Sequence, residues 1–267
     1  MNIAVKWKVR KPNYKFSENI ERYWFNHSIF KTHLANALTL LFPDVEKFFV
    51  RTVKNFLPDV KNEQLRKAIL AFIGQETQHS IQHEKFWKNL QAQGYNLNEF
   101  LIPFRKFAFE FIEPVHSPEA RLALTAGLEH YTTMLAEIGL ENNLFQNAEP
   151  ELKKLFEWHC VEELEHKAVA FDLLQEVNPS YLLRIYGVIL ASLLMLSIIP
   201  LATFYFVNSD KKLFSREFWD EGMDFLFFKQ KVLPKGIEIL LEYFNPNFHP
   251  NQRDHLALIK NVELNSK

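Results

Sequence analysis

Apolar side chains recur every three or four positions over most of this chain, which is the spacing that one face of an α-helix requires. Four long segments carry this pattern, at residues 34–56, 62–93, 117–142 and 150–177. We find no alternating apolar and polar pattern typical of strands, and no glycine-rich phosphate loop. The pattern therefore predicts an all-α protein.

Residues that favour helix ends agree with these boundaries. Gly94 follows the second segment as a C-terminal stop. Ser117 and Pro118 suit the N-cap and first helical position of the third segment. Pro150 opens the fourth segment, whereas Pro43 interrupts the first. From about residue 215 onwards, we expect a tail with further short helices.

Residues 185–207 contain no charged side chain and are long enough to span a bilayer. Basic residues flank this segment on both sides, so they fix no topology: Arg184, Lys211, Lys212 and Arg216. The alternative is a buried helix, or a helix pair broken at Pro200, that covers the other helices. We favour membrane insertion or tight membrane association. The expected units are a bundle at 1–180, an apolar helical segment at 181–208 and a helical tail at 209–267.

Composition narrows the class of protein. The chain has 267 residues, 26 Phe and 7 Gly, which favours helices over a turn-rich β protein. A net charge of −1 gives no general attraction to nucleic acid. The single cysteine, Cys160, allows no internal disulfide, and the N-terminus lacks a signal-peptide apolar region. We expect a cytoplasmic protein, associated with the inner membrane if the apolar segment inserts.

Two Glu-x-x-His motifs lie within the predicted helices, and each has an extra histidine one turn away. The first motif is Glu76 and His79, followed by His83, and the second is Glu163 and His166, preceded by His159. At about 100° per residue, the three side chains of each set fall within roughly 60° of one another on a helix. Each helix therefore directs one carboxylate and two imidazoles towards a common point.

A lone glutamate lies on the helix before each motif, Glu46 before the first and Glu129 before the second. This order of Glu, Glu-x-x-His, Glu, Glu-x-x-His is typical of ferritin-like four-helix bundles with a di-iron carboxylate site. A third match, Glu113 to His116, contains a proline and lies between predicted helices, so we discard it. The sequence thus predicts a ferritin-like four-helix bundle core, with a hydrophobic C-terminal helical segment, around a dinuclear metal site.

Some assignments stay open at this level. Asp44 is a rival to Glu46 because Pro43 makes the register uncertain. His159 and His83 either bind metal directly or orient the carboxylates; we favour direct binding for His159 and leave His83 undecided. Glu162 and Glu165 point to other helix faces and are expected to be solvated. The predicted metal ligands are Glu46, Glu76, His79, His83, Glu129, His159, Glu163 and His166.

With these motifs, the chain resembles a bacterial family known as predicted metal-dependent hydrolases. The resemblance covers most of the chain and includes residues 9–12, 72–79, 158–167, 169–172, 248–250 and the apolar segment. It implies a metal-dependent enzyme, and the family's name implies hydrolysis. The run of His159, Glu163 and His166 is also similar to the three-histidine di-iron site of arylamine N-oxygenases, from which His83 departs.

These features favour a di-iron enzyme that activates dioxygen and oxidises a small hydrophobic or lipid-like substrate. Such an enzyme needs two iron ions, dioxygen and an electron donor; manganese or zinc is the alternative metal. A membrane contact is expected, and nucleic acid is not. The alternative function is hydrolysis of an ester or phosphoester by a metal-bound hydroxide. Metal storage is a third hypothesis, but the apolar segment argues against a soluble cage.

Overall fold

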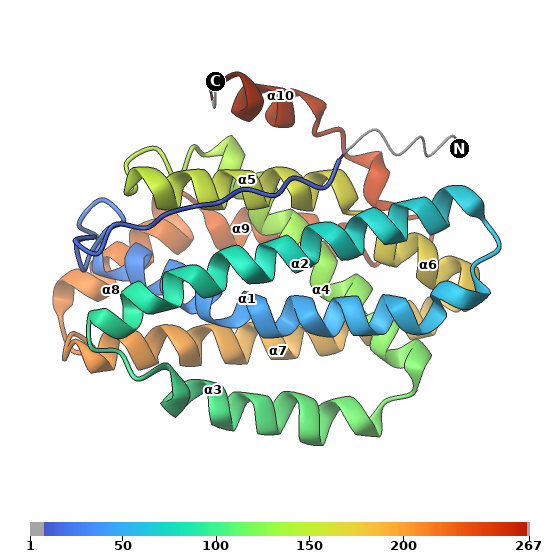
Figure 1. Ribbon diagram of the computed structural model, residues 1–267, viewed down its shortest axis with the longest axis horizontal. Coiled ribbons are helices and arrows are strands. Elements are labelled where there is room, and N and C mark those ends of the chain that lie inside the picture. Colours follow the sequence, from blue (N-terminus) through green and yellow to red (C-terminus); the bar gives the residue numbers. More distant parts are fainter. Residues whose placement is uncertain (1–7, 266–267) are drawn as a thin grey trace.

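Helices account for every regular element in the part of the chain that the computed structural model describes, residues 8–265 (Figure 1). Extended pairing within this range is limited to an isolated bridge between Phe25 and Ala148. The prediction of an all-α protein is confirmed.

Four helices enclose the centre of the molecule. They are α1 (Ile29–Phe56), α2 (Glu63–Ala92), α4 (Pro118–Glu141) and α5 (Pro150–His166). α1 packs on α2 and α4 packs on α5, and contacts of α1 with α4 and of α2 with α5 close the ring. A short 3₁₀ turn, η1 (Leu57–Asp59), follows α1. The four segments that carry helical spacing in the sequence contain these four helices.

Side-chain caps explain where several of these helices begin. The Asn62 side chain accepts hydrogen bonds from the backbone N–H groups of the first turn of α2, and Ser117 caps α4 in the same way. After α2, Gly94 adopts a φ of +94°, a left-handed conformation that glycine tolerates best. These boundaries agree with the sequence prediction.

Two predictions of helix continuity differ from the structure, one at Pro43 and one after His166. α1 runs straight through Pro43, although a proline removes the hydrogen bond to the carbonyl four residues earlier. That carbonyl, on Thr39, instead accepts a hydrogen bond of 3.0 Å from the Trp87 indole, so the helix continues. Conversely, the helix expected over 150–177 is two helices, α5 and α6 (Val169–Val177). The break at Lys167 and Ala168 contains no glycine or proline that would have signalled it.

The apolar segment forms one helix, α7 (Tyr181–Ser209), which continues through Pro200 rather than breaking there. α7 packs along both α4 and α1. The approach to α4 is close at Gly187, where an added Cβ atom would lie 2.2 Å from the Ala123 carbonyl oxygen. α7 therefore joins the bundle as a neighbour of α1 and α4.

The remaining elements lie around this bundle. α3 (Leu97–Arg105) continues through the π-helical turn η2 (Lys106–Ile112) and the 3₁₀ turn η3 (Glu113–Val115), and runs along the lower edge in Figure 1. The tail forms α8 (Arg216–Met223), η4 (Asp224–Phe228), α9 (Val232–Glu242), η5 (Pro250–Gln252) and α10 (Leu256–Asn265). α8 packs on α1, α9 on α4 and α10 on α5, and α10 lies at the edge opposite α3 (Figure 1).

Candidate metal centre

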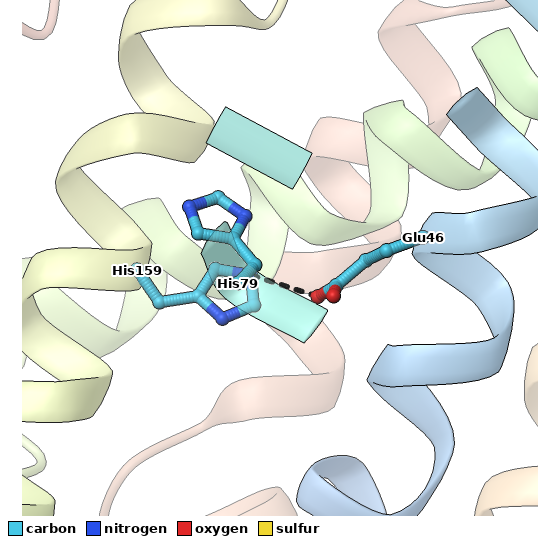
Figure 2. Close-up of side chains that lie close together, drawn as sticks. All are labelled: Glu46, His79 and His159. Carbon is cyan, nitrogen blue, oxygen red and sulfur yellow. Dashed lines mark ion pairs between the residues drawn. The ribbon is translucent and has the colours of Figure 1, made fainter. Parts of the chain in front are cut away.

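Seven of the eight predicted metal ligands converge between α1, α2, α4 and α5. Each of them is at most 3% exposed: Glu46, Glu76, His79, Glu129, His159, Glu163 and His166. Figure 2 shows three of these side chains, Glu46 from α1, His79 from α2 and His159 from α5, pointing towards one another. Residues that are far apart in the sequence therefore form one buried cluster.

The cluster divides into three overlapping groups that could each hold a metal ion. The groups are Glu46, His79 and His159; Glu76, His79 and Glu163; and Glu76, Glu129 and His166. Within each group the potential ligand atoms lie within 4.8 Å of one another. Because the groups share Glu76 and His79, they form a continuous array of carboxylate oxygens and imidazole nitrogens.

His79 of α2 and His166 at the C-terminus of α5 each direct one ring nitrogen into the cluster and the other towards a partner outside it. His79 Nδ1 lies 3.6 Å from a Glu76 oxygen and 3.5 Å from a Glu163 oxygen, whereas its Nε2 lies 3.1 Å from Glu162. His166 Nε2 lies 3.1 Å from a Glu76 oxygen, and its Nδ1 lies 3.1 Å from the Gln75 side-chain oxygen. Metal-binding histidines typically have such a partner on the second nitrogen, because it fixes the ring's tautomer and orientation.

His159 follows the same arrangement, with His83 as its outer partner. His159 Nε2 lies 3.0 Å from Glu163, and its Nδ1 lies 2.7 Å from His83 Nε2. The remaining nitrogen of His83 lies 3.2 Å from the Thr39 hydroxyl. Both ring nitrogens of His83 thus face protein groups, and His83 belongs to none of the three groups.

Glu162 and Glu165 are not solvated, contrary to the sequence prediction. Glu162 is fully buried against His79 and accepts a 3.2 Å hydrogen bond from Arg10. Glu165 accepts hydrogen bonds from Arg10 and from Gln75. The chain segment before α1 covers this helix face. Arg10 bonds to Glu162, the outer partner of His79. Through Glu165 it is also linked to Gln75, the outer partner of His166. A helical wheel of α5 alone contains no signal for this cover.

Several buried oxygens and nitrogens of the cluster have no hydrogen-bond partner among the described residues. They are both carboxylate oxygens of Glu76 and Glu129, one oxygen each of Glu46 and Glu163, His79 Nδ1 and His166 Nε2. Burial of a polar atom without a partner is costly, and burial of an unpaired charge costs more. Carboxylate oxygens and imidazole nitrogens are good ligands for divalent iron, manganese and zinc. The residues therefore fit divalent metal ions.

The electrostatics of the cluster reflect the crowding of its carboxylates. Burial, and then repulsion from Glu76, raises the pKa of Glu46 well above its usual value. Burial and the neighbouring Glu163 raise the pKa of Glu129 similarly. Burial acts to lower the pKa of His79, but its contacts with Glu162 and Glu76 outweigh this effect and raise the pKa to about 10. Divalent cations would relieve the repulsion that these shifts reflect.

An apolar pocket reaches the cluster from the side of α3 and α7. Most of its lining is aliphatic or aromatic and comes from α1, α3, η2, α4 and α7, with Glu46 and Glu163 among the lining residues. Three partly exposed residues, Glu113, His116 and Arg121, also line it. The pocket thus brings an apolar space into contact with two of the candidate ligands.

The sequence alternatives fall outside the cluster. Asp44, the rival to Glu46, forms a 2.7 Å ion pair with Arg105. The discarded third motif lies around the 3₁₀ turn η3, where His116 is 2.6 Å from the Tyr186 hydroxyl. Cys160 is buried in an apolar group with Ala136, Leu140, Val161 and Leu164.

Comparison with known proteins identifies the family. A sequence profile described as predicted metal-dependent hydrolase matches residues 8–254. No curated protein and no solved structure matches the chain. The matched range contains the buried Glu and His cluster and the pocket beside it. The chain belongs to the family of predicted metal-dependent hydrolases.

Proposed function

We propose that the chain is an enzyme with a dinuclear metal centre that acts on a substrate with a long apolar portion. Two candidate ligands, Glu46 and Glu163, line the apolar pocket, and this contact carries the proposal. A substrate in the pocket would have its apolar portion among aliphatic and aromatic side chains and its reacting group at the metals.

The distances support a division of the ligands between the two ions. Glu46, His79 and His159 would hold the first ion, and Glu129 and His166 the second. Glu76 lies near both His79 and His166, and Glu163 lies near both His159 and His166, so these carboxylates would be within reach of both ions. His83, Glu162 and Gln75 would orient the three histidines from outside. Four carboxylates and three imidazoles suit a ferritin-like centre.

Hydrolysis is the reaction that the family's description supports. Divalent ions held by these carboxylates and imidazoles would supply an activated water for hydrolysis of a carbonyl or phosphoryl ester at neutral pH. The pocket favours an ester or phosphoester of a long-chain acid or alcohol. The protein's contribution would be to bind the chain, exclude bulk water and position the scissile bond at Glu46 and Glu163.

Oxidation of an apolar substrate is a second candidate, favoured by the pocket lining next to the cluster. Of the polar groups that line the pocket, Glu46 and Glu163 would bind the metals. The Thr132 hydroxyl is also engaged, because it donates a 3.1 Å hydrogen bond to the Glu129 backbone carbonyl. The lining beside Glu46 and Glu163 is otherwise aliphatic and aromatic, which suits an apolar carbon as the reacting group. Two irons in this carboxylate and histidine shell would supply electrons to dioxygen. This reaction needs dioxygen and an external electron donor.

One experiment separates the two reactions. The purified protein is loaded with iron anaerobically, or with zinc or manganese, and assayed with p-nitrophenyl esters of increasing acyl length, with Glu163→Gln as the control. Ester hydrolysis that rises with chain length, needs metal and is independent of oxygen would support hydrolysis. A transient visible band when oxygen reaches the reduced iron protein, without ester turnover, would support oxidation. A protein that binds no metal would overturn the proposal itself.

A further inference from the structure

α7 exposes an apolar stripe along much of its length. The exposed side chains follow one another at intervals of three to five residues and are between 44% and 77% exposed: Leu182, Tyr186, Ile189, Leu193, Leu196 and Leu201. The opposite side of the helix is fully buried at Val188, Ala191, Ala202 and Phe206. A helix on the surface of a soluble bundle normally has a polar outer face. α7 is apolar on both faces, and the bundle covers one of them.

The serine and threonine hydroxyls of α7 donate hydrogen bonds within the helix. Ser192 and Ser197 donate to the carbonyls four residues earlier at 2.7 Å, and Thr203 donates to Ile199 at 2.8 Å. Serine and threonine in lipid-facing helices satisfy their hydroxyls in this way, because a bilayer core offers no water. Thr203 is buried and Ser192 accepts a hydrogen bond from Tyr131, so both face the bundle. Ser197 is exposed, and because its hydroxyl is already bonded within the helix, the outer face at this position is suited to hydrocarbon.

Neighbouring elements extend this surface on both sides of α7. On one side, His116 after η3 bonds to Tyr186, and the nearby η2 and η3 expose Phe107, Phe111 and Val115, which are 46–70% exposed. On the other side, Phe204 packs against Trp219 of α8 with ring centres 6.1 Å apart. We call the exposed apolar residues of η2, η3, α7 and α8 the apolar face. Such an extended apolar surface marks an interaction site.

The rim of the apolar face has mixed charge. Exposed Lys106, Lys211 and Arg216 alternate with exposed Glu110, Glu217 and Asp220. An interface specific for anionic lipid would show a basic excess. Burial of apolar surface, rather than attraction to anionic headgroups, would therefore drive binding at this face.

Packing within the bundle determines how α7 would meet a membrane. Its buried side lies along α4 and α1, and Gly187 is in direct contact with the α4 backbone. α1 carries the exposed Lys47 and Arg51 side chains, which are 50% and 49% exposed. A spanning orientation would separate α7 from these helices or place these charges in hydrocarbon, which is costly. The geometry favours a helix that lies in the plane of one leaflet.

The pocket lies directly behind this face. Leu194, Met195 and Ile198 of α7 line it, together with Phe104 of α3 and Phe109 of η2. We infer that the apolar face inserts into one leaflet of a lipid bilayer, and that the pocket takes an acyl chain from that leaflet. The acyl-chain step rests on the proposed function, whereas the insertion of the face does not.

Vesicle flotation tests the insertion. The intact protein is mixed with vesicles of phosphatidylcholine, with or without phosphatidylglycerol, and compared with the double variant Leu193→Glu and Leu196→Glu. Both of these leucines are 64% exposed, so the variant should fold. The matched control is Leu256→Glu and Leu264→Glu on α10, at 61% and 69% exposed and on the opposite edge of the molecule (Figure 1).

We expect wild type and the α10 control to float with both vesicle types, and the α7 variant to lose at least about tenfold in partitioning. Brominated lipid should quench the fluorescence of Trp219, as judged by comparison with Trp219→Phe. Equal flotation of the α7 variant and the control would overturn the inference. The inference would also be overturned if, without vesicles, wild type and the α10 control formed dimers and the α7 variant were a monomer. The apolar face would then join two copies of the chain.

The acyl-chain step has its own readout, which does not depend on turnover. cis-Parinaric acid in the vesicles should gain fluorescence on transfer to the wild-type pocket, and Ala108→Phe, which fills the pocket from η2, should abolish the gain while flotation persists. Transfer that is unchanged in Ala108→Phe would overturn this step. The metal content of the α7 variant separates the two proposals, because loss of flotation with two metals retained leaves the metal centre intact.

Discussion

At the scale of single residues, the metal centre depends on which nitrogen of each histidine faces the carboxylates. In the sequence, His83 follows the first Glu-x-x-His motif by one turn and His159 precedes the second by one turn; at that level we favour direct binding for His159 and leave it open for His83. The structure separates them, because His159 Nε2 faces Glu163 whereas His83 lies behind His159 and contacts Thr39. The order of the two rings follows from how α1, α2 and α5 pack together, which spacing along one helix does not encode.

Substitution of each histidine tests this assignment. We expect His159→Ala to lose one of two bound metals, because a direct ligand disappears. His83→Ala should retain both metals at saturation but bind them about 10 to 100 times more weakly, as expected for loss of an orienting partner. Metal titration followed by elemental analysis measures both effects. If His83→Ala lost as much metal as His159→Ala, His83 would have to be counted as a ligand.

The outer residues show the limit of prediction at this scale. Periodicity alone indicated that Glu76 and His79, and Glu163 and His166, share a helix face, and the structure brings the four side chains into one buried cluster. Periodicity failed for Glu162 and Glu165, which are buried by a segment about 150 residues earlier in the chain; Arg10 and Glu162 are 152 residues apart. Which segment covers a helix face is decided by tertiary packing, and the spacing within that helix does not indicate it.

At the scale of elements, the helix ends that have capping residues lie where they were predicted. The predicted break at Pro43 is absent, and a break that was not predicted lies between α5 and α6. Asn62, Ser117 and Gly94 act locally, so their signals appear in the sequence. The carbonyl that Pro43 leaves without its helical partner in α1 accepts a hydrogen bond from the Trp87 indole of another helix, and the break after His166 has no local signal. Prediction failed where tertiary contacts overrode local preference.

The contact between α7 and α4 gives a prediction for a single glycine. In Gly187→Ala, the new Cβ would lie 2.2 Å from the Ala123 carbonyl oxygen, a backbone atom that moves only if the helices separate. We expect the free energy of unfolding to fall by about 2 kcal/mol or more, as for overpacked cores. Chemical denaturation measures this difference.

Gly236→Ala on α9 is the matched control for this change. Its nearest neighbour would be the flexible Met134 side chain at 3.3 Å, so it should be neutral or slightly stabilising. If both alanine variants were equally stable, the close approach of α7 to α4 would be wrong.

At the scale of the whole molecule, the C-terminal tail bonds to the bundle through a buried carboxylate on α4. Glu137 accepts hydrogen bonds from Arg253 and, at 2.8 Å, from His255, both just before α10. Burial acts to raise the pKa of Glu137, but these hydrogen bonds outweigh it and lower the pKa to about 2. Long-range pairing of this kind could not be derived from helical spacing, and the sequence predicted only that the tail contains short helices.

This shift predicts a pH-dependent contribution to stability. Because the folded-state pKa is below the ordinary value of 4.5, the ionised carboxylate stabilises the fold above that pH, and the contribution disappears as the pH falls towards 2. Allowing for solvent screening, Glu137→Gln should lower the free energy of unfolding at pH 7 by about 1–2 kcal/mol. Denaturation of both proteins at several pH values should show this difference shrinking below pH 4.5. A constant difference would rule out this role for Glu137.

The most direct test of the metal centre is elemental analysis of protein purified without chelator. We predict two metal ions per chain in the wild type and fewer in Glu76→Ala and His166→Ala, whose side chains lie in the cluster. The double variant Glu113→Ala and His116→Ala removes the third Glu-x-x-His motif, which lies outside the cluster, and should retain both ions. Metal-free wild type, or two ions in all variants, would contradict the assignment.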